Sequence, residues 1–217
     1  MSYNIKIAID GTAASGKGTL AKRLCEEFKF AYLDTGKLYR LVAYITITEN
    51  IDYTNSELVA EQFLNYDLNR ISSLGTELKG DEIGKIASVV ASYQSLRKIL
   101  LKYQQDFANK KHHNKKGVIL DGRDIGTVVL PNAHIKFYVD ASIEIRAERR
   151  WKELISLGQS TIKRNVLEDL RSRDKRDSQR KISPLLPASD AILLDTTNLD
   201  ADEVFDLARK YIVNYLN

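Results

Sequence analysis

The sequence is poor in the features that disulfide-linked and membrane-spanning proteins require. Its 217 residues include one cysteine, Cys25, so no internal disulfide can form. No apolar stretch approaches the roughly 18–20 residues that a helix needs to cross a bilayer. The N-terminus lacks the charged region, apolar region and cleavage site that make a secretory signal. We therefore expect a cytoplasmic protein that binds no membrane.

Basic residues slightly outnumber acidic ones and are unevenly spread. The chain has 33 Lys and Arg against 29 Asp and Glu, a formal net charge of +4 and a pI of about 9.0. An excess of positive charge suits either a nucleic acid or a small anionic substrate. Lys and Arg concentrate at 146–181, but they form no basic stripe regularly interleaved with aromatic residues, which argues against a nucleic-acid partner. The basic run 110–116 is typical of a solvated loop, and its two histidines have no nearby His or Cys partner for a metal.

Short apolar runs alternate with segments of helical periodicity, which is typical of an α/β fold with a parallel sheet. We expect strands at 4–9, near 30–33, 117–120, 134–139 and 191–195. We expect helices at 17–28, 37–48, 86–108, 142–157, 161–173 and 201–215. The runs 118–120 and 192–194 are apolar throughout, as in strands that are buried on both faces.

Two regions interrupt this alternation. Residues 50–85 combine apolar side chains with turn signals and predict an insertion with a short strand pair, carried by Phe63, Tyr66, Leu68 and Ile71. Residues 174–189 are polar and charged and contain two prolines, which predicts a mobile surface segment.

The segment Gly11–Thr19 is the most informative part of the chain. It follows the apolar run 5–9, and its order of strand, glycine-rich turn, lysine, hydroxyl and helix is that of a phosphate-binding loop. Its glycines let backbone N–H groups turn inward around a phosphate chain, and the following helix points its positive end at the same anion. The segment therefore predicts binding of ATP phosphates by Gly11, Thr12, Ala13, Ala14, Ser15, Gly16, Lys17, Gly18 and Thr19.

The lysine and the hydroxyl of this segment have distinct roles. Lys17 reaches the β- and γ-phosphates, and a Ser or Thr hydroxyl holds Mg²⁺. The general motif has that hydroxyl directly after the lysine, where this sequence has Gly18. We therefore assign the Mg²⁺-side hydroxyl to Thr19.

A second group of polar residues follows the strand expected at 117–120. Asp121 lies at the carboxyl end of that strand, where parallel sheets bind ligands, and beside a phosphate loop it orients Mg²⁺ or the water around it. Arg123 keeps its charge and presents a fork that matches phosphate oxygens. The alternative interpretation is a turn at the strand end with a surface ion pair. After the second strand, Asp34 or Thr35 is placed to cap a helix.

Together these motifs resemble the bacterial cytidylate kinase family over nearly the whole chain. The segments that carry the resemblance are Asp10–Thr19, Asp34–Arg40, Asp121–Val129 and Arg173–Asp177. The resemblance implies a three-layer P-loop α/β fold with a parallel central sheet, formed by one kinase domain at 1–217. It also implies a small monophosphate-binding insertion at about 50–85 and a mobile lid at about 158–188.

The resemblance implies an enzyme that transfers the γ-phosphoryl group of ATP to CMP or dCMP with Mg²⁺. The protein would act as a monomer. Lys17, Asp121, Arg123 and Arg180 would serve catalysis. By matching position, the CMP phosphate is assigned to Arg40, Arg123 and Arg180, cytosine to Ser88, Arg97 and Asp124, the sugar to Arg173 and Asp177, and a further substrate contact to Thr35. The family usually has an arginine after Glu82-Ile83, where this sequence has Gly84.

The chemistry of the base agrees with these assignments. A carboxylate suits the amino group of cytosine, and arginine and serine suit its two acceptors. UMP, which has a carbonyl in place of the amino group, should be a much poorer substrate. Arginines in 146–180, including Arg146 and Arg150, are candidates to close over the transferring group, although each alone also fits an ordinary salt-bridged helix face.

Three other functions stay open at this point. A P-loop kinase for another small acceptor, such as a different nucleotide or shikimate, would share the phosphate loop. A basic nucleic-acid-binding module would bind in a salt-dependent way and would not need Lys17. A regulatory nucleotide switch would bind without an acceptor, but the Asn-Lys-x-Asp pattern of guanine recognition is absent from the sequence.

Overall fold

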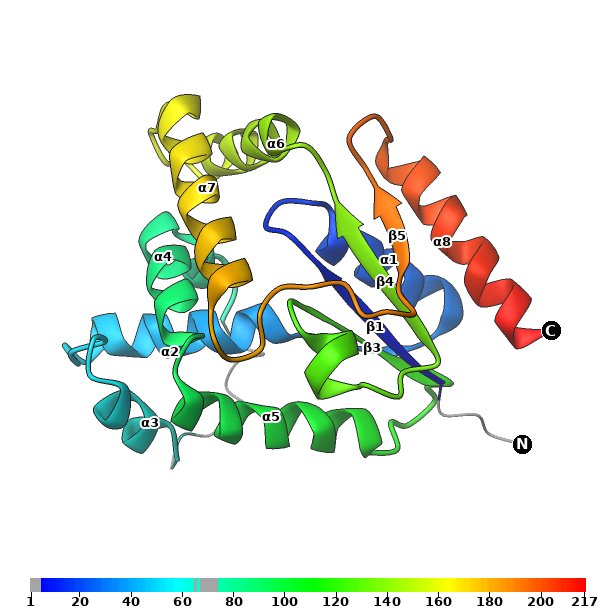
Figure 1. The fold of residues 1–217 in the computed structure, drawn as a ribbon, viewed down its shortest axis with the longest axis horizontal. Helices are drawn as coiled ribbons and strands as arrows, with labels where there is room; N and C mark the ends of the chain where they lie inside the picture. The colour runs from blue at the N-terminus through cyan, green and yellow to red at the C-terminus, as the bar shows by residue number, and fades with distance from the viewer. Residues whose placement is uncertain (1–4, 65, 67–73) are drawn as a thin grey trace.

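A parallel five-stranded sheet lies at the centre of the structure (Figure 1). The computed structural model describes residues 5–64, 66 and 74–217. The strands are β1 (Ile5–Gly11), β2 (Ala31–Asp34), β3 (Gly117–Gly122), β4 (Ile135–Asp140) and β5 (Ile192–Asp195). They are ordered β2-β3-β1-β4-β5, and every neighbouring pair is parallel. The expected α/β class and the five expected strand positions are confirmed.

Helices connect these strands and extend beyond the sheet. They are α1 (Lys17–Phe28), α2 (Thr35–Thr48), α3 (Ser56–Leu64), α4 (Asp81–Val90), α5 (Gln94–Asn109), α6 (Ile143–Ser156), α7 (Lys163–Gln179) and α8 (Ala201–Leu216). Two short turns add to them: the 3₁₀ turn η2 (Thr76–Lys79) and the π-helical turn η3 (Ile125–Val129). Within the described part of the chain, none of the helices has both the length and the apolar character that a membrane crossing needs.

The two faces of the sheet have different cores, as the alternation of side chains along a strand requires. Ile7 and Ile9 of β1 pack with α1 and α8, together with Ile119 of β3. Ala8 of β1 packs instead with the end of α5 and with η3. The result is three layers, with the sheet between two sets of helices (Figure 1).

Helices α2 to α5 form a further apolar cluster beside the sheet. Val59 and Phe63 of α3 are buried in it, and their spacing of four residues places both on one face of a helix. The strand pair expected in 50–85 is therefore wrong at Phe63, and Tyr66 lies in no strand. Leu68 and Ile71 lie outside the described residues.

The long helix expected at 86–108 is two helices. Helix α4 ends at Val90 and α5 begins at Gln94, yet Ile86 and Leu96 still pack in the same apolar cluster. Polar groups satisfy the carbonyls at the break: Arg97 Nη1 donates to Ala91 O at 3.0 Å. The apolar stripe continues across the break, and no glycine or proline marks it, so no local pattern predicts it.

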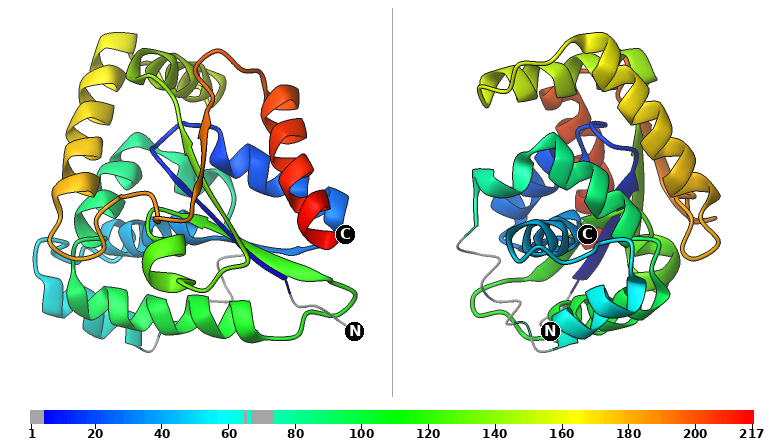
Figure 2. Two further views of the ribbon diagram at one scale, coloured as in Figure 1. Left: turned by 45° about the vertical axis from the view of Figure 1, so that its right-hand side comes forward. Right: turned by 90° about the vertical axis from the view of Figure 1, so that its left-hand side faces the viewer.

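Helix α7 corrects the prediction for 174–189. It runs to Gln179, so the first part of the predicted irregular segment is helical. Asp177 is only 4% exposed, because its charge is paired with arginines rather than solvated. Residues 180–191 form neither helix nor strand, as expected. Figures 1 and 2 show α6 and α7 beyond the carboxyl ends of the strands, with α7 returning past α4.

Candidate active site

A cavity of about 370 Å³ lies at the carboxyl ends of the strands. Its walls come from the phosphate loop, α2, α4, α5, the end of β3 and α7. All the residues predicted to contact the acceptor line it: Thr35, Arg40, Ser88, Arg97, Arg123, Asp124, Arg173, Asp177 and Arg180. The fold thus brings into one space side chains that are up to 145 residues apart in the chain.

The phosphate loop has the shape that the sequence predicts. Gly16 has φ +92° and is the N-cap of α1, and no side chain caps that helix end. The first N–H groups of α1 are therefore available to an anion. Gly11 is required for a different reason: a Cβ at this position would lie 1.9 Å from Val139 O of β4. Gly11, Thr12 and Ser15 belong to the loop but do not line the cavity.

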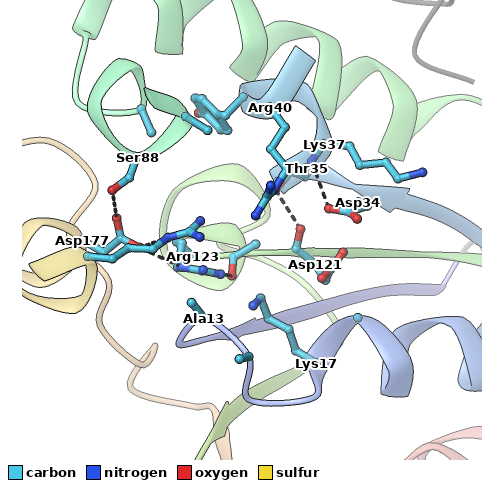
Figure 3. A pocket seen from close by; sticks show the side chains of 18 of the residues that line it. Ala13, Lys17, Asp34, Thr35, Lys37, Arg40, Ser88, Asp121, Arg123 and Asp177 are labelled. Carbon is cyan, nitrogen blue, oxygen red and sulfur yellow. Dashed lines mark hydrogen bonds and ion pairs between the residues drawn. The ribbon is translucent and has the colours of Figure 1, made fainter. Parts of the chain in front are cut away.

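Lys17 and Asp121 face each other across the floor of the cavity (Figure 3). Lys17 Nζ donates to Thr12 O at 3.0 Å, which holds the ammonium group over the loop. Burial and then repulsion by Arg123 lower the pKa of Lys17, and burial and then repulsion by Asp34 raise the pKa of Asp121. Opposed shifts of this kind are concentrated at functional sites. A bound phosphate chain would favour the charged form of the lysine.

Oxygen atoms are the ligands available for Mg²⁺ beside this pair. Asp121 lies behind Gly18, and a Cβ on that glycine would be 3.8 Å from Asp121 Oδ2. Thr19 is exposed at the mouth of the cavity. No three His, Cys, Asp or Glu side chains cluster as a metal site in 5–64, 66 and 74–217. This donor set fits Mg²⁺, which keeps several waters and is held by one or two carboxylates together with phosphates.

Two contacts, one from β2 and one from the start of α2, fix Asp121 in place. Tyr32 Oη of β2 donates to Asp121 Oδ1 at 2.9 Å. Thr35 Oγ1 donates to the backbone carbonyl of Asp121 at 2.7 Å. Because its hydroxyl proton is committed there, the predicted substrate contact of Thr35 is limited to an acceptor role. Asp34 caps α2 by accepting from Lys37 N at 3.1 Å, as one of the two sequence alternatives foresaw.

Carboxylates neutralise the arginines on the acceptor side of the cavity (Figure 3). Arg123 Nε donates to Asp177 Oδ2 at 3.0 Å, and Ser88 Oγ donates to Asp177 Oδ1 at 3.2 Å. Burial opposes ionisation of Asp177, but Arg123 and Arg173 together hold its pKa below the usual range. Ser88, from α4, is therefore tied to α7.

A second pairing holds Asp124. Its carboxylate pairs with Arg97 of α5, and Arg180 Nη2 lies 3.9 Å from Asp124 Oδ1. The ring of Tyr39 lies 5.5 Å from the Arg97 guanidinium carbon and also lines the cavity. Ser88 and Arg97 are nine residues apart, which would place them on different faces of one helix, and the break after α4 removes that difficulty.

Two further arginines, Arg40 and Arg173, are less fully neutralised and are repelled by neighbouring arginines. Burial and then repulsion by Arg150 lower the pKa of Arg40 to about 10. Burial and then repulsion by Arg123 lower the pKa of Arg173 to about 9, and Arg173 Nε is buried without a hydrogen-bond partner. Such a cluster of cations fits a phosphate group. Arg40 can approach α4 closely because Gly84 has no side chain: a Cβ there would lie 3.2 Å from Arg40 Nη2.

The two arginines proposed to close over the site have different positions. Arg150 lines the cavity and donates to Lys79 O at 3.0 Å. Arg146 is buried outside it, where it donates to Ala13 O at 3.4 Å and pairs with Asp174 at 2.8 Å. Arg146 therefore ties the phosphate loop to α6 and α7. Sequence reasoning gave Tyr32 and Tyr39 no role, because an aromatic residue at a buried position normally indicates core.

Comparisons with known proteins show the family to which the chain belongs. A model of the family described as cytidylate kinase matches residues 7–214. The cytidylate kinase of Paramagnetospirillum magneticum is 48% identical over 205 residues, which cover 93% of this chain and 94% of that protein. The cytidylate kinase of Bacillus subtilis is 40% identical over 218 residues, which cover 95% of each chain. An uncharacterized protein from Eubacterium ventriosum, known from its crystal structure, shares the fold with a TM-score of 0.55 at 16% identity, covering 96% of this chain and 98% of that one. The chain belongs to the cytidylate kinase family.

Proposed function

We propose that the protein transfers the γ-phosphoryl group of ATP to CMP or dCMP, giving CDP or dCDP and ADP. The observation that carries this proposal is a single cavity with two kinds of lining. One part is the uncapped N-terminus of α1 at the phosphate loop, and the other is the group of polar side chains around Asp124. Family membership gives the same reaction. The substrates are small nucleotides, and the protein is proposed to act as a monomer.

The phosphate loop holds the donor. The N–H groups at the start of α1 and the ammonium group of Lys17 bind the phosphates of ATP and stabilise the charge that develops on them. Thr19 and Asp121 would hold Mg²⁺ and its water. The bound ion would supply positive charge that offsets part of the negative charge of the phosphates.

The arginines on the other side hold the acceptor. Arg40, Arg123 and Arg180 bind the phosphate of CMP and direct one of its oxygens toward the γ-phosphorus. A phosphate monoester is mostly ionised near pH 7, so no general base is needed to activate it. Positioning and charge stabilisation carry most of the rate enhancement in this class of reaction.

The remaining residues read the nucleoside. Asp124 accepts from the amino group of cytosine, while Ser88 and Arg97 meet its acceptors. Arg173 and Asp177 contact the sugar. We propose no filter against a missing 2′-hydroxyl, so dCMP is accepted as well as CMP. UMP would leave Asp124 facing a carbonyl, and the unpaired buried groups would lower its kcat/KM by orders of magnitude.

Two segments have their own roles within a single kinase domain at 1–217. Residues of about 50–85, which include α3 and η2, form the monophosphate-binding insertion. Residues of about 158–188, which include α7, form the lid. Closure of α7 over the cavity would exclude water and suppress ATP hydrolysis.

ADP release with a panel of acceptors tests the proposal. The wild-type protein receives Mg²⁺ and ATP with CMP, dCMP, UMP, AMP, GMP, shikimate or no acceptor. The fastest turnover is expected with CMP and dCMP. Faster turnover with another acceptor would keep the donor site and overturn the cytosine contacts. Absence of turnover from folded protein would overturn the kinase assignment.

A further inference from the structure

Asp10 is a buried acidic residue that the proposed reaction leaves without a role. It lies in β1, directly before the first residue of the phosphate loop, and is 3% exposed. Side chains alternate along β1, so Ile9 faces α1 while Ala8 and Asp10 face the layer that contains η3. The carboxylate therefore points toward the turn that follows Asp124.

Both oxygens of Asp10 accept hydrogen bonds from that turn. Ile125 N donates to Asp10 Oδ1 at 2.7 Å, and Gly126 N donates to Asp10 Oδ2 at 2.7 Å. The first N–H groups of a helical turn have no partner within the turn. A carboxylate satisfies two of them at once, because both of its oxygens are acceptors, and its charge strengthens each bond. Asp10 thus caps η3 from a strand more than a hundred residues away.

The contact is close because residue 126 is a glycine. A Cβ at Gly126 would lie 3.3 Å from Asp10 Oδ2 and 3.1 Å from Lys136 Cδ. Lys136 has little room to move away, since its Nζ donates to Pro131 O at 2.6 Å and to Asp190 Oδ1 at 2.9 Å. Gly126 is therefore enclosed between the Asp10 carboxylate and the Lys136 side chain, which leaves no free space for a larger residue.

This cap fixes the backbone of Asp124. The carbonyl of Asp124 accepts from Val128 N at 2.9 Å and Val129 N at 3.1 Å, within η3. The next N–H along the chain, that of Ile125, is held by Asp10. The peptide that follows Asp124 is thus bound on both its carbonyl and its N–H side. Loss of the cap would let η3 shift and carry Asp124 with it.

We propose that Asp10 is a positioning residue that sets the place of Asp124 against the acceptor base. The proposal rests on the proposed function and adds to it a residue that touches neither substrate. Because Asp10 directly precedes the phosphate loop, one side chain links the donor half of the cavity to the carboxylate that reads the base. Selectivity for CMP over UMP should therefore depend on Asp10.

The variant Asp10→Asn tests this proposal. Asparagine keeps the shape, but its NH₂ group faces one of the two N–H donors and cannot accept from it. We expect the ratio of kcat/KM for CMP to kcat/KM for UMP to fall about tenfold, as for the loss of one charge-assisted hydrogen bond. A disturbed phosphate loop or a smaller folded fraction would lower both rates alike and leave the ratio unchanged.

Two further variants complete the test. Gly126→Ala strains the same hydrogen bond from the side of its donor, so it should also lower the CMP-to-UMP ratio of kcat/KM. This variant replaces Asp10→Asn in the test if Asp10→Asn does not fold. Val204→Ala in α8 reduces packing in the core on the opposite face of the sheet and should leave the ratio unchanged. The ¹⁵N–¹H resonances of Ile125 and Gly126 should move in Asp10→Asn.

The failures of the two proposals are distinguishable. An unchanged CMP-to-UMP ratio in folded Asp10→Asn, or in folded Gly126→Ala where Asp10→Asn does not fold, would overturn the positioning role while the kinase assignment stands. A wild-type protein without CMP turnover would overturn the proposed function itself.

Discussion

The donor and acceptor halves of the cavity are built in opposite ways. The donor half is one continuous segment, Gly11–Thr19, at a helix end whose N–H groups have no side-chain cap. The acceptor half is collected from several elements, and its charges are largely paired before any substrate binds: Asp177 with Arg123, and Asp124 with Arg97. The donor half is ready for an anion, whereas the acceptor half must exchange existing contacts for those of its substrate.

This difference explains where selectivity resides. Backbone N–H groups and a lysine bind any phosphate chain, so the donor half distinguishes nucleotides poorly. In the acceptor half a substrate must replace buried polar contacts one for one, and a mismatched base leaves groups unpaired at a high free-energy cost. Substitutions in the two halves should therefore change different kinetic quantities.

The largest effect is expected from Lys17→Ala in the donor half. Removing the ammonium group that stabilises the transferring charge should lower kcat by about 10³-fold or more with every acceptor. Circular dichroism should show an intact fold, and Lys210→Ala on the exposed side of α8 is the matched control. Retained turnover in Lys17→Ala would exclude the assigned role of the phosphate loop.

The next largest effect is expected in the pH dependence of the free energy of unfolding, through Asp10, which links the two halves. Burial raises the pKa of Asp10 from 3.8 to about 6. A folded carboxyl with a raised pKa takes up its proton before the unfolded chain does, so the wild type gains stability as pH falls from 7 toward 4. Relative to Asp10→Asn, that gain should reach about 2.4 kcal/mol in the free energy of unfolding at pH 4. Denaturation curves at pH 7, 5.5 and 4 measure it, and a constant difference between the two proteins contradicts the raised pKa.

In the acceptor half, Asp124→Asn should relax the choice of base. The amide can donate to the carbonyl of UMP, so the CMP-to-UMP ratio of kcat/KM should fall by about tenfold to a hundredfold. The effect on the choice of base should exceed the loss of stability measured on the same protein. Asp202→Asn, at a surface ion pair of α8, is the control. An unchanged preference for CMP would refute Asp124 as the cytosine reader.

The smallest effect is expected from Tyr32→Phe, which removes one hydrogen bond to Asp121. A net loss of about 1 kcal/mol should raise the Mg²⁺ concentration for half-maximal activity about fivefold. Calorimetry measures how much Mg²⁺ strengthens the binding of ADP, and this gain should be smaller in Tyr32→Phe than in the wild type. The control variant Tyr53→Phe, at an exposed position, should keep the full gain. Tyr32 contacts Asp121 and not the residues assigned to the base. A lowered CMP-to-UMP ratio in Tyr32→Phe would therefore contradict the division of roles between the two halves.

The same contrast governs what the sequence could predict. The strands and the phosphate loop follow from local patterns, such as the apolar run before Gly11 and the spacing to Lys17. The acceptor residues were assigned only through a family resemblance, since nothing local relates Ser88 to Asp177. The charge of residues 174–179 predicted a solvated irregular segment, but these residues continue helix α7, and ion pairs with arginines bury Asp177.

Other features depend on contacts that no local pattern contains. At the break between α4 and α5, the side chain of Arg97 in α5 donates a hydrogen bond to the carbonyl of Ala91 at the end of α4. The helix that includes Phe63 depends on packing against α2 and α5 rather than on a turn signal. The cap of η3 by Asp10 joins residues whose numbers differ by 115.

Transfer of phosphate to CMP is the claim on which the account depends most, and ³¹P NMR observes it directly. Wild-type protein with Mg²⁺, ATP and CMP should convert the CMP resonance into the two resonances of CDP. ADP should form in equal amount, without free phosphate. Free phosphate and ADP with CMP unchanged would identify an ATPase instead, and would contradict the assignment of the acceptor half.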